Sequence, residues 1–142
     1  MQQTMQQTLI INKRPQDAYR RQDVLTANAG DLIVMLYDAL KKNIVLGRRG
    51  IEKKNIQAAH EKLMKAQLIV SELMNCLDMS YPISDELLAL YEFMLRSLQE
   101  ANIRKDPEPL IPLLEMVDSL RTAWHEVSQT TRGNLYYGED QA

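Results

Sequence analysis

The sequence has one cysteine, no long hydrophobic run and no strong excess of either charge. With Cys76 as the only cysteine in 142 residues, no intrachain disulfide is possible, and its place at the end of an apolar helical pattern favours packing as a small hydrophobic group. No apolar run approaches the roughly 20 residues that span a bilayer, and Leu9-Ile10-Ile11 is far shorter than the apolar part of a secretory signal. We therefore expect a cytoplasmic protein without membrane insertion.

A formal net charge of -2 does not favour a nucleic-acid binder or a protein that binds anionic membranes. Glycine and proline are scarce at five each, and β-branched runs are few, which argues against β structure. Leu, Met, Ala, Glu and Lys are abundant, and these residues lose little rotamer freedom in a helix. The 45% hydrophobic content suits one soluble domain with a core.

The apolar spacing predicts four helices. The first begins after Asn28, a capping residue followed three positions later by Asp31, and runs from Ala29 to about Lys53. Its apolar stripe is wider than one partner helix needs, with Leu32, Met35 and Ala39 beside the main seam. Gly47 lies inside this helix, and we interpret it as a site of close helix–helix approach.

Asn55 is predicted to cap the second helix, which has a heptad seam made of Ile56, Ala59, Leu63, Ala66, Val70, Leu73 and Leu77. Ser84 is predicted to cap the third helix. Asp106 is predicted to cap the fourth, with Pro107 at its first position and Pro112 delaying or kinking the start.

This pattern predicts an all-α protein, an antiparallel up-down four-helix bundle with a short N-terminal helical or extended arm. Residues 1–28 form the flexible arm, with a possible short helix over 17–23; residues 29–128 form the bundle; residues 129–142 form a flexible tail.

No residue pattern indicates reaction chemistry. Di-iron bundles use Glu-x-x-His pairs, but Gln57 precedes His60 and Thr122 precedes His125, so no metal site, cofactor or catalytic residue is predicted. Two alternatives stay open at this point: a histidine-phosphotransfer bundle that uses His60, and a generic helical adaptor. An ordinary solvated histidine is the favoured interpretation of His60. The eight methionines and the apolar surplus favour an adaptable groove for amphipathic partner helices.

Several motifs resemble the flagellar secretion chaperone family FliS. The stretch Ala29–Asp38 is similar to that family's Pro-Gly-Glu/Asp-Leu…Met-Leu-Tyr-Asp signature, with Ala29 in place of the usual proline. Leu90-Tyr91-Glu92-Phe93-Met94 and Leu120-Arg121-Thr122-Ala123-Trp124 add further matches in the same order. The resemblance spans roughly residues 19–127.

The resemblance implies a non-enzymatic cytosolic chaperone that binds the disordered C-terminal segment of flagellin in apolar grooves. It further implies that the protein prevents premature polymerisation and passes its client to a gate component of the flagellar type III export apparatus. Tyr19 and Val24 are then expected to form an N-terminal plug over the first helix. The residues expected to contact flagellin lie off the inner seams: Leu32, Met35, Met64, Leu68, Phe93 and Leu95.

Overall fold

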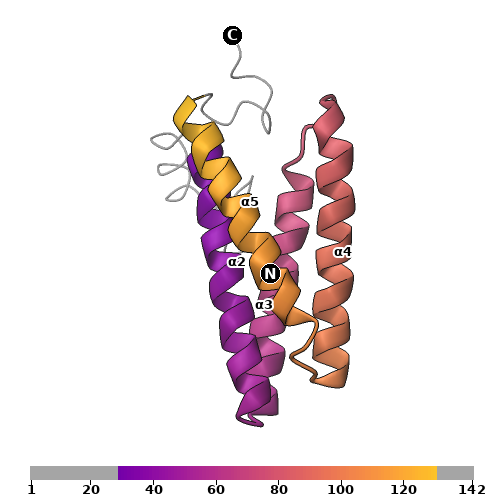
Figure 1. Cartoon of the computed structure of the whole chain (residues 1–142). Helices are drawn as coiled ribbons and strands as arrows, with labels where there is room; N and C mark the ends of the chain where they lie inside the picture. Colours follow the sequence, from indigo (N-terminus) through magenta and orange to yellow (C-terminus); the bar gives the residue numbers. More distant parts are fainter. Residues whose placement is uncertain (1–28, 131–142) are drawn as a thin grey trace, which may run out of the picture.

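The computed structural model describes residues 29–130, and these form four helices with no strand among them (Figure 1). The helices are α2 (Ala29–Glu52), α3 (Ile56–Asn75), α4 (Pro82–Arg104) and α5 (Leu110–Thr130). They alternate in direction along the chain, so the predicted all-α, up-down four-helix bundle is confirmed. The predicted short helix over 17–23 and the capping residue Asn28 lie outside the described residues.

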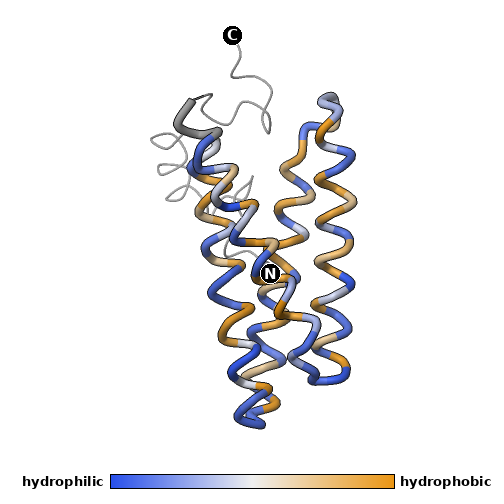
Figure 2. The backbone as a smooth tube through the Cα atoms, viewed as in Figure 1, coloured by the Kyte–Doolittle hydropathy of each residue, from blue (hydrophilic) through white to orange (hydrophobic). Residues whose placement is uncertain are grey.

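Helix α2 forms where the sequence predicts it, because its apolar residues recur with helical spacing on a broad face. Figure 2 shows the alternation of polar and apolar residues along all four helices. The α2 face that points into the bundle is fully buried at Ile33, Tyr37, Leu40 and Ile44.

The connection between α2 and α3 is a tight turn built from backbone hydrogen bonds. The Asn55 amide donates to the Gly50 carbonyl at 2.8 Å and the Lys54 amide donates to the Ile51 carbonyl at 3.0 Å, which is the Schellman arrangement. Lys54 occupies the left-handed position of this motif with φ 61°. The Asn55 side chain accepts a hydrogen bond from the Ala58 amide at 3.2 Å, which confirms the predicted cap of α3.

The prediction that Ser84 caps α4 is wrong. The helix begins two residues earlier, at Pro82, whose fixed φ suits the first helical position, and Tyr81 is the extended residue before it. Ser84 is buried instead, and its Oγ donates a hydrogen bond of 2.6 Å to the Asp78 carbonyl. The side chain therefore ties the first turn of α4 to the end of the preceding loop.

Helix α5 starts later than the prediction that Asp106 caps it directly, and that part of the prediction is wrong. Asp106 Oδ1 accepts a hydrogen bond from the Glu108 amide at 3.0 Å, so it closes a turn in front of the helix. The helix itself begins at Leu110, three residues after Pro107. The sequence predicted that Pro112 would delay the start of this helix or kink it. In the structure Pro112 lies in the first turn of α5, where the missing N–H has no intrahelical partner and costs little.

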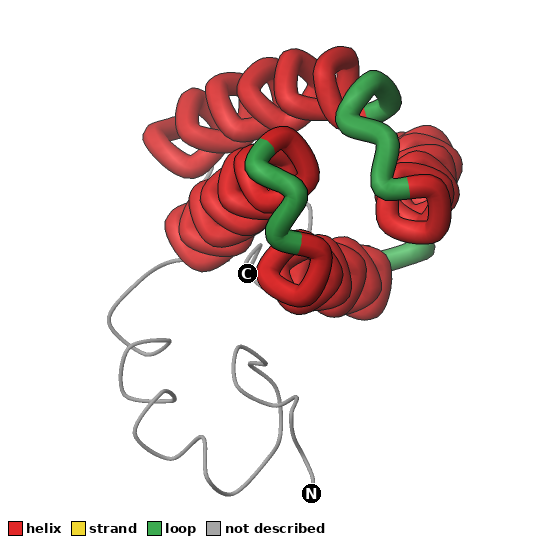
Figure 3. The backbone as a smooth tube through the Cα atoms, turned by 90° about the horizontal axis from the view of Figure 1, so that it is seen from below, coloured by secondary structure: helices red, strands yellow, loops and turns green. Residues whose placement is uncertain are grey.

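Seen from below, the helices form a ring in the order α5, α2, α3, α4 (Figure 3). Helix α5 starts beside the end of α4 and then rises diagonally to lie along the first half of α2 (Figure 1). The α2–α3 contact is the most extensive of the ring, and the α4–α5 contact is the least extensive among its neighbouring pairs.

Glycine lets α2 and α3 approach closely. A Cβ added at Gly47 would lie 2.6 Å from Leu63 Cδ2, and one added at Gly50 would lie 2.9 Å from the Ala59 backbone nitrogen. The prediction of close helix approach at Gly47 is confirmed, and Gly50 does the same against backbone atoms. Helices α2 and α4 also contact each other across the centre of the ring. The hydroxyls of Tyr37 on α2 and Tyr91 on α4 lie 2.5 Å apart, and both side chains are fully buried.

Candidate partner-binding surface

The described residues contain neither a cluster of metal ligands nor a membrane-spanning helix. No group of three or more His, Cys, Asp or Glu side chains among them could hold a metal ion. No helix within residues 29–130 is long and apolar enough to cross a membrane.

His60, the residue of the phosphotransfer alternative, takes part in a contact between α3 and α4. Its Nδ1 lies 3.1 Å from Asn102 Nδ2. Lys105 Nζ in turn donates to the carbonyl and the Oδ1 of Asn102, at 2.7 and 2.9 Å. This chain of polar contacts secures the end of α4, where Lys105 has a left-handed backbone with φ 52°. The surroundings of His60 are thus those of a residue that joins two helices.

Several motif residues noted in the sequence have architectural roles. Tyr37 and Tyr91, each from a different motif, share the buried hydroxyl contact. Asp38 accepts from Arg121 Nε at 2.7 Å, which joins the first motif on α2 to the last motif on α5. Trp124, from the same α5 motif, is buried in the core. Nothing in the sequence alone indicated that these motifs contact one another.

Electrostatic contacts reinforce the α2–α5 pairing at the surface. A second ion pair joins Lys41 Nζ to Asp118 Oδ1 at 2.9 Å, beside the Arg121–Asp38 pair. The hydrogen bond that Arg121 donates to Asp38, together with the negative charge of that carboxylate, raises the pKa of Arg121 above its ordinary value. At the α3–α4 turn, hydrogen bonds from the Ser80 hydroxyl and amide lower the pKa of Asp78.

Four of the six residues predicted to contact a client are exposed large apolar side chains. Their exposed fractions are 54% for Met35, 51% for Leu68, 42% for Phe93 and 41% for Met64. Met64 and Leu68 are four residues apart and share one face of α3, away from its buried stripe. Met35 lies on α2 and Phe93 on α4, so these side chains are distributed over three helices.

The other two members of that prediction lie deeper. Leu32 is only 9% exposed, and Leu95 is half-buried and packs against the core. Their part in client binding stays a prediction. Tyr19 and Val24, the predicted plug, lie outside the described residues.

The structure also exposes apolar residues that the prediction did not include: Ile56, Met79, Ile83, Ile103 and Ile111. Most of these lie at or near the ends of helices. The prediction that Ile56 belongs to the inner seam of α3 is wrong, because at the first position of the helix its side chain is 51% exposed. A surface of flexible and aliphatic side chains on rigid helices can accept an amphipathic chain, with main-chain polar groups satisfied inside the incoming helix.

Comparisons with known proteins agree in pointing to one family. The sequence profile of the family described as FliS, flagellar protein FliS, matches residues 11–131. A flagellar secretion chaperone FliS of Bacillus subtilis (strain 168) is 35% identical over 120 residues, covering 84% of this chain and 90% of that protein. A protein of the same description from Salmonella typhimurium is 31% identical over 108 residues, covering 74% and 80%. One from Vibrio cholerae is 28% identical over 103 residues, covering 71% and 76%.

Proposed function

The chain belongs to the FliS family of flagellar secretion chaperones, and from this membership we propose that it is a cytoplasmic export chaperone for flagellin. It binds the disordered C-terminal segment of flagellin, prevents premature polymerisation and assists delivery to the flagellar type III export apparatus. The family is one of chaperones, so the protein is not an enzyme.

The observation that carries the proposal is the exposure of Met35, Met64, Leu68 and Phe93 on a bundle that is otherwise well packed. These large apolar side chains remain about half exposed, and burying the rest of each would stabilise the protein by about 1 kcal/mol. A disordered client that folds on binding can bury them as amphipathic helices, at the cost of its own ordering. The client's helices satisfy their own backbone hydrogen bonds, so the apolar surface needs no matching polar groups.

The proposal is tested by calorimetric titration with a peptide that covers the C-terminal segment of flagellin. Leu68→Lys and Phe93→Lys place a charge in the proposed contact and should weaken binding by about tenfold or more each. Gln99→Lys, at an exposed polar position on α4, is the matched control and should leave affinity unchanged. Circular dichroism should show intact helices in all three variants, because each position is exposed. Unchanged affinity in both apolar variants would contradict the proposal.

The plug is tested separately. If Tyr19 and Val24 compete with the client for the same surface, deletion of residues 1–24 should tighten binding of the flagellin peptide. Equal or weaker affinity after the deletion would remove the plug from the proposal and leave the client surface in place.

A further inference from the structure

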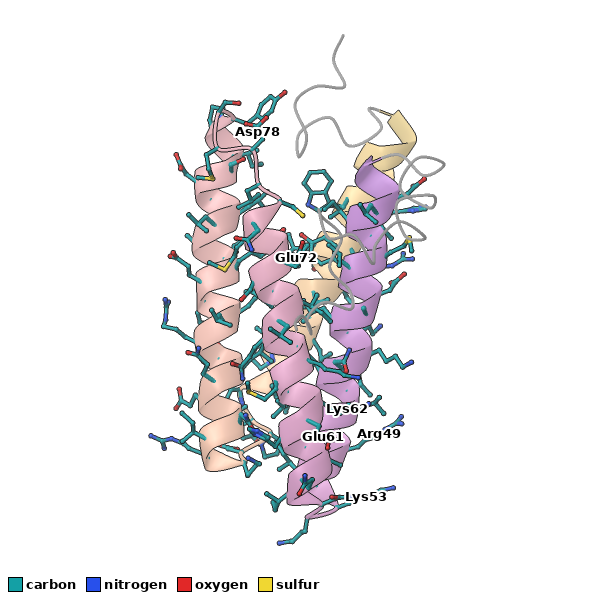
Figure 4. The ribbon with its side chains drawn as sticks, turned by 180° about the vertical axis from the view of Figure 1, so that it is seen from behind. Arg49, Lys53, Glu61, Lys62, Glu72 and Asp78 are labelled. Carbon is teal, nitrogen blue, oxygen red and sulfur yellow. The ribbon has the colours of Figure 1, made fainter. Side chains whose placement is uncertain are left out.

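Positive charge is concentrated at one end of the α2–α3 hairpin. Residues 41–65 contain eight lysines and arginines but only two acidic residues, in a chain whose formal net charge is -2. The close contacts of Gly47 with Leu63 and of Gly50 with Ala59 place the last turns of α2 beside the first turns of α3. Figure 4 shows Arg49, Lys53 and Lys62 near one another at this end, with Glu61 among them. Glu72 and Asp78 lie toward the other end of the hairpin (Figure 4).

Most of these cations form no ion pair with a carboxylate of the described residues. Lys41 pairs with Asp118 and Arg48 pairs with Glu52. Within residues 29–130, no ion pair joins the other cations of the stretch to a carboxylate. We call these other cations the basic patch: Lys42, Arg49, Lys53, Lys54, Lys62 and Lys65.

The arrangement of the basic patch lowers the stability of the hairpin. Arg49 and Lys53 are four residues apart, and Lys62 and Lys65 are three apart, so like charges face each other along both helices. Cations at the end of α2 are favoured by its helix dipole, but the first turn of α3 contains no acidic residue to complement the opposite pole. Lys54 adds a left-handed backbone at a position where glycine would be unstrained. Folding alone therefore does not account for this set of residues.

Helical spacing arranges the patch as a continuous surface. Lys42, Arg49 and Lys53 repeat at intervals of seven and four, so they follow one stripe on the outer side of α2. From Lys42 to Glu52, the last residue of α2, the helix rises about 15 Å, and Lys53 and Lys54 extend the patch just beyond it, so it could match about 12 helical residues in a partner. Ile56 and Met64, two exposed apolar side chains, lie in the same part of α3 as Lys62 and Lys65.

We propose that the basic patch binds an acidic, amphipathic segment of a partner protein. Its carboxylates pair with the cations of the patch, while its apolar side chains contact Ile56 and Met64. A continuous phosphate backbone fits less well, because Glu52 and Glu61 lie within the stretch and two exposed apolar side chains, Ile56 and Met64, lie in the same part of α3. The site shares Met64 with the proposed flagellin contact but does not include Leu68 or Phe93, and its test uses no flagellin.

The probe is a capped, glutamate-rich amphipathic peptide of about 12 residues, with its glutamine analogue as a negative control. Titration of the full chain, followed by amide NMR, should shift resonances within residues 42–65. Arg49→Glu/Lys53→Glu should weaken binding by about tenfold or more, and added salt should weaken binding to the unchanged protein. The matched control is Arg96→Glu/Arg104→Glu on α4, which changes the net charge equally and should alter affinity by less than about threefold.

Equal weakening by both double variants would show a response to overall charge and would overturn the site. Binding of the glutamine analogue with similar affinity would overturn the role of the carboxylates. Tighter binding of single-stranded DNA or of phosphatidylglycerol vesicles, with the same dependence on Arg49 and Lys53, would overturn the assignment to a protein partner.

Discussion

The two pairs of consecutive helices, α2–α3 and α4–α5, have short connections but differ in how closely they pack. In the α2–α3 pair, glycines at 47 and 50 bring backbone and side chains into direct contact, and Ala59, Leu63 and Ala66 are fully buried. The α4–α5 pair meets near its connection, and then α5 diverges toward α2 (Figures 1 and 3). On these two helices, Leu90, Met116 and Leu120 pack against the core but stay half-buried.

The difference indicates that the bundle combines a tight hairpin with a loosely joined pair. Residue size explains the tight side, because small residues at matching positions let two helices approach. Polar contacts explain the loose side, since the Arg121–Asp38 and Lys41–Asp118 pairs attach α5 to α2 and not to α4. The exposed apolar side chains do not follow this division, because Met35, Met64 and Leu68 lie on the tight pair and Phe93 lies on the loose one.

The largest effect should come from forcing the tight hairpin apart. Gly50→Leu places a side chain where the Ala59 backbone lies within 2.9–3.0 Å, and backbone cannot move aside as a flexible side chain does. We expect a loss of about 3 kcal/mol in the free energy of unfolding, measured by urea denaturation. Ser119→Leu, the same kind of enlargement at an exposed position of α5, should change it by no more than about 0.5 kcal/mol. Similar losses in both variants would remove the distinction between the two pairs.

The next effect concerns the contact that crosses the ring. Tyr37→Phe removes the hydroxyl that faces Tyr91, and both side chains are fully buried, so the free energy of unfolding should fall by about 1–2 kcal/mol. Tyr91→Phe should have a comparable effect. The double variant should cost less than the two single losses added together, because the second substitution removes a group already left without this partner. Strict additivity in chemical denaturation would show that the two hydroxyls do not interact.

A smaller effect, of opposite sign, is expected at the turn of the tight hairpin. Lys54 has φ 61°, which costs a side-chain-bearing residue about 1 kcal/mol relative to glycine in the same conformation. Lys54→Gly should therefore raise the free energy of unfolding by about 0.5–1 kcal/mol, as measured by thermal and urea denaturation. The same substitution should weaken binding of the glutamate-rich probe, since it removes a cation of the basic patch. A destabilised variant would show that the lysine side chain contributes to folding.

The smallest effect should come from the surface contact that holds α5 to α2. Arg121→Ala removes an ion pair of 2.7 Å between side chains that are both partly exposed, so the expected loss is about 0.2–1 kcal/mol. The raised pKa of Arg121 keeps its guanidinium charged through the neutral and moderately alkaline range, so within that range salt and not pH is the informative variable. The difference between wild type and variant should shrink as salt increases. A difference that salt leaves unchanged would point to packing of the arginine stem.

Residue spacing was sufficient to predict the helices and much of the core. The Asn55 cap and the close approach at Gly47 are local features, and each is found as predicted. The middle of the α3 seam is buried as predicted, but its first residue, Ile56, is exposed and its last, Leu77, lies beyond the end of the helix. The two wrong starts, at Ser84 and Asp106, share a cause: both residues lie beside prolines, and several turn conformations compete over those few residues. Which turn conformation forms depends on which side chains of the turn pack against the neighbouring helix.

The residues predicted to contact a client were only partly identified from the helix pattern. Met35, Met64, Leu68 and Phe93 were chosen because they lie off the inner seams, and all four are exposed. Leu32 and Leu95 were chosen by the same rule, but Leu32 is buried and Leu95 is half-buried. Whether a flanking position is covered depends on where the adjacent helices lie, which a single helix pattern does not specify.

The sequence by itself determined the all-α class, the order of four antiparallel helices and the resemblance to the FliS family, because helical periodicity, turn residues and motif order are all written along the chain. Only the tertiary structure decided which motif residues pair, such as Tyr37 with Tyr91 and Arg121 with Asp38, and which apolar side chains remain in solvent. It also gathered cations from two helices into one basic patch. These outcomes depend on the distance and rotation between helices, and those are set by how side chains from separate segments pack against one another.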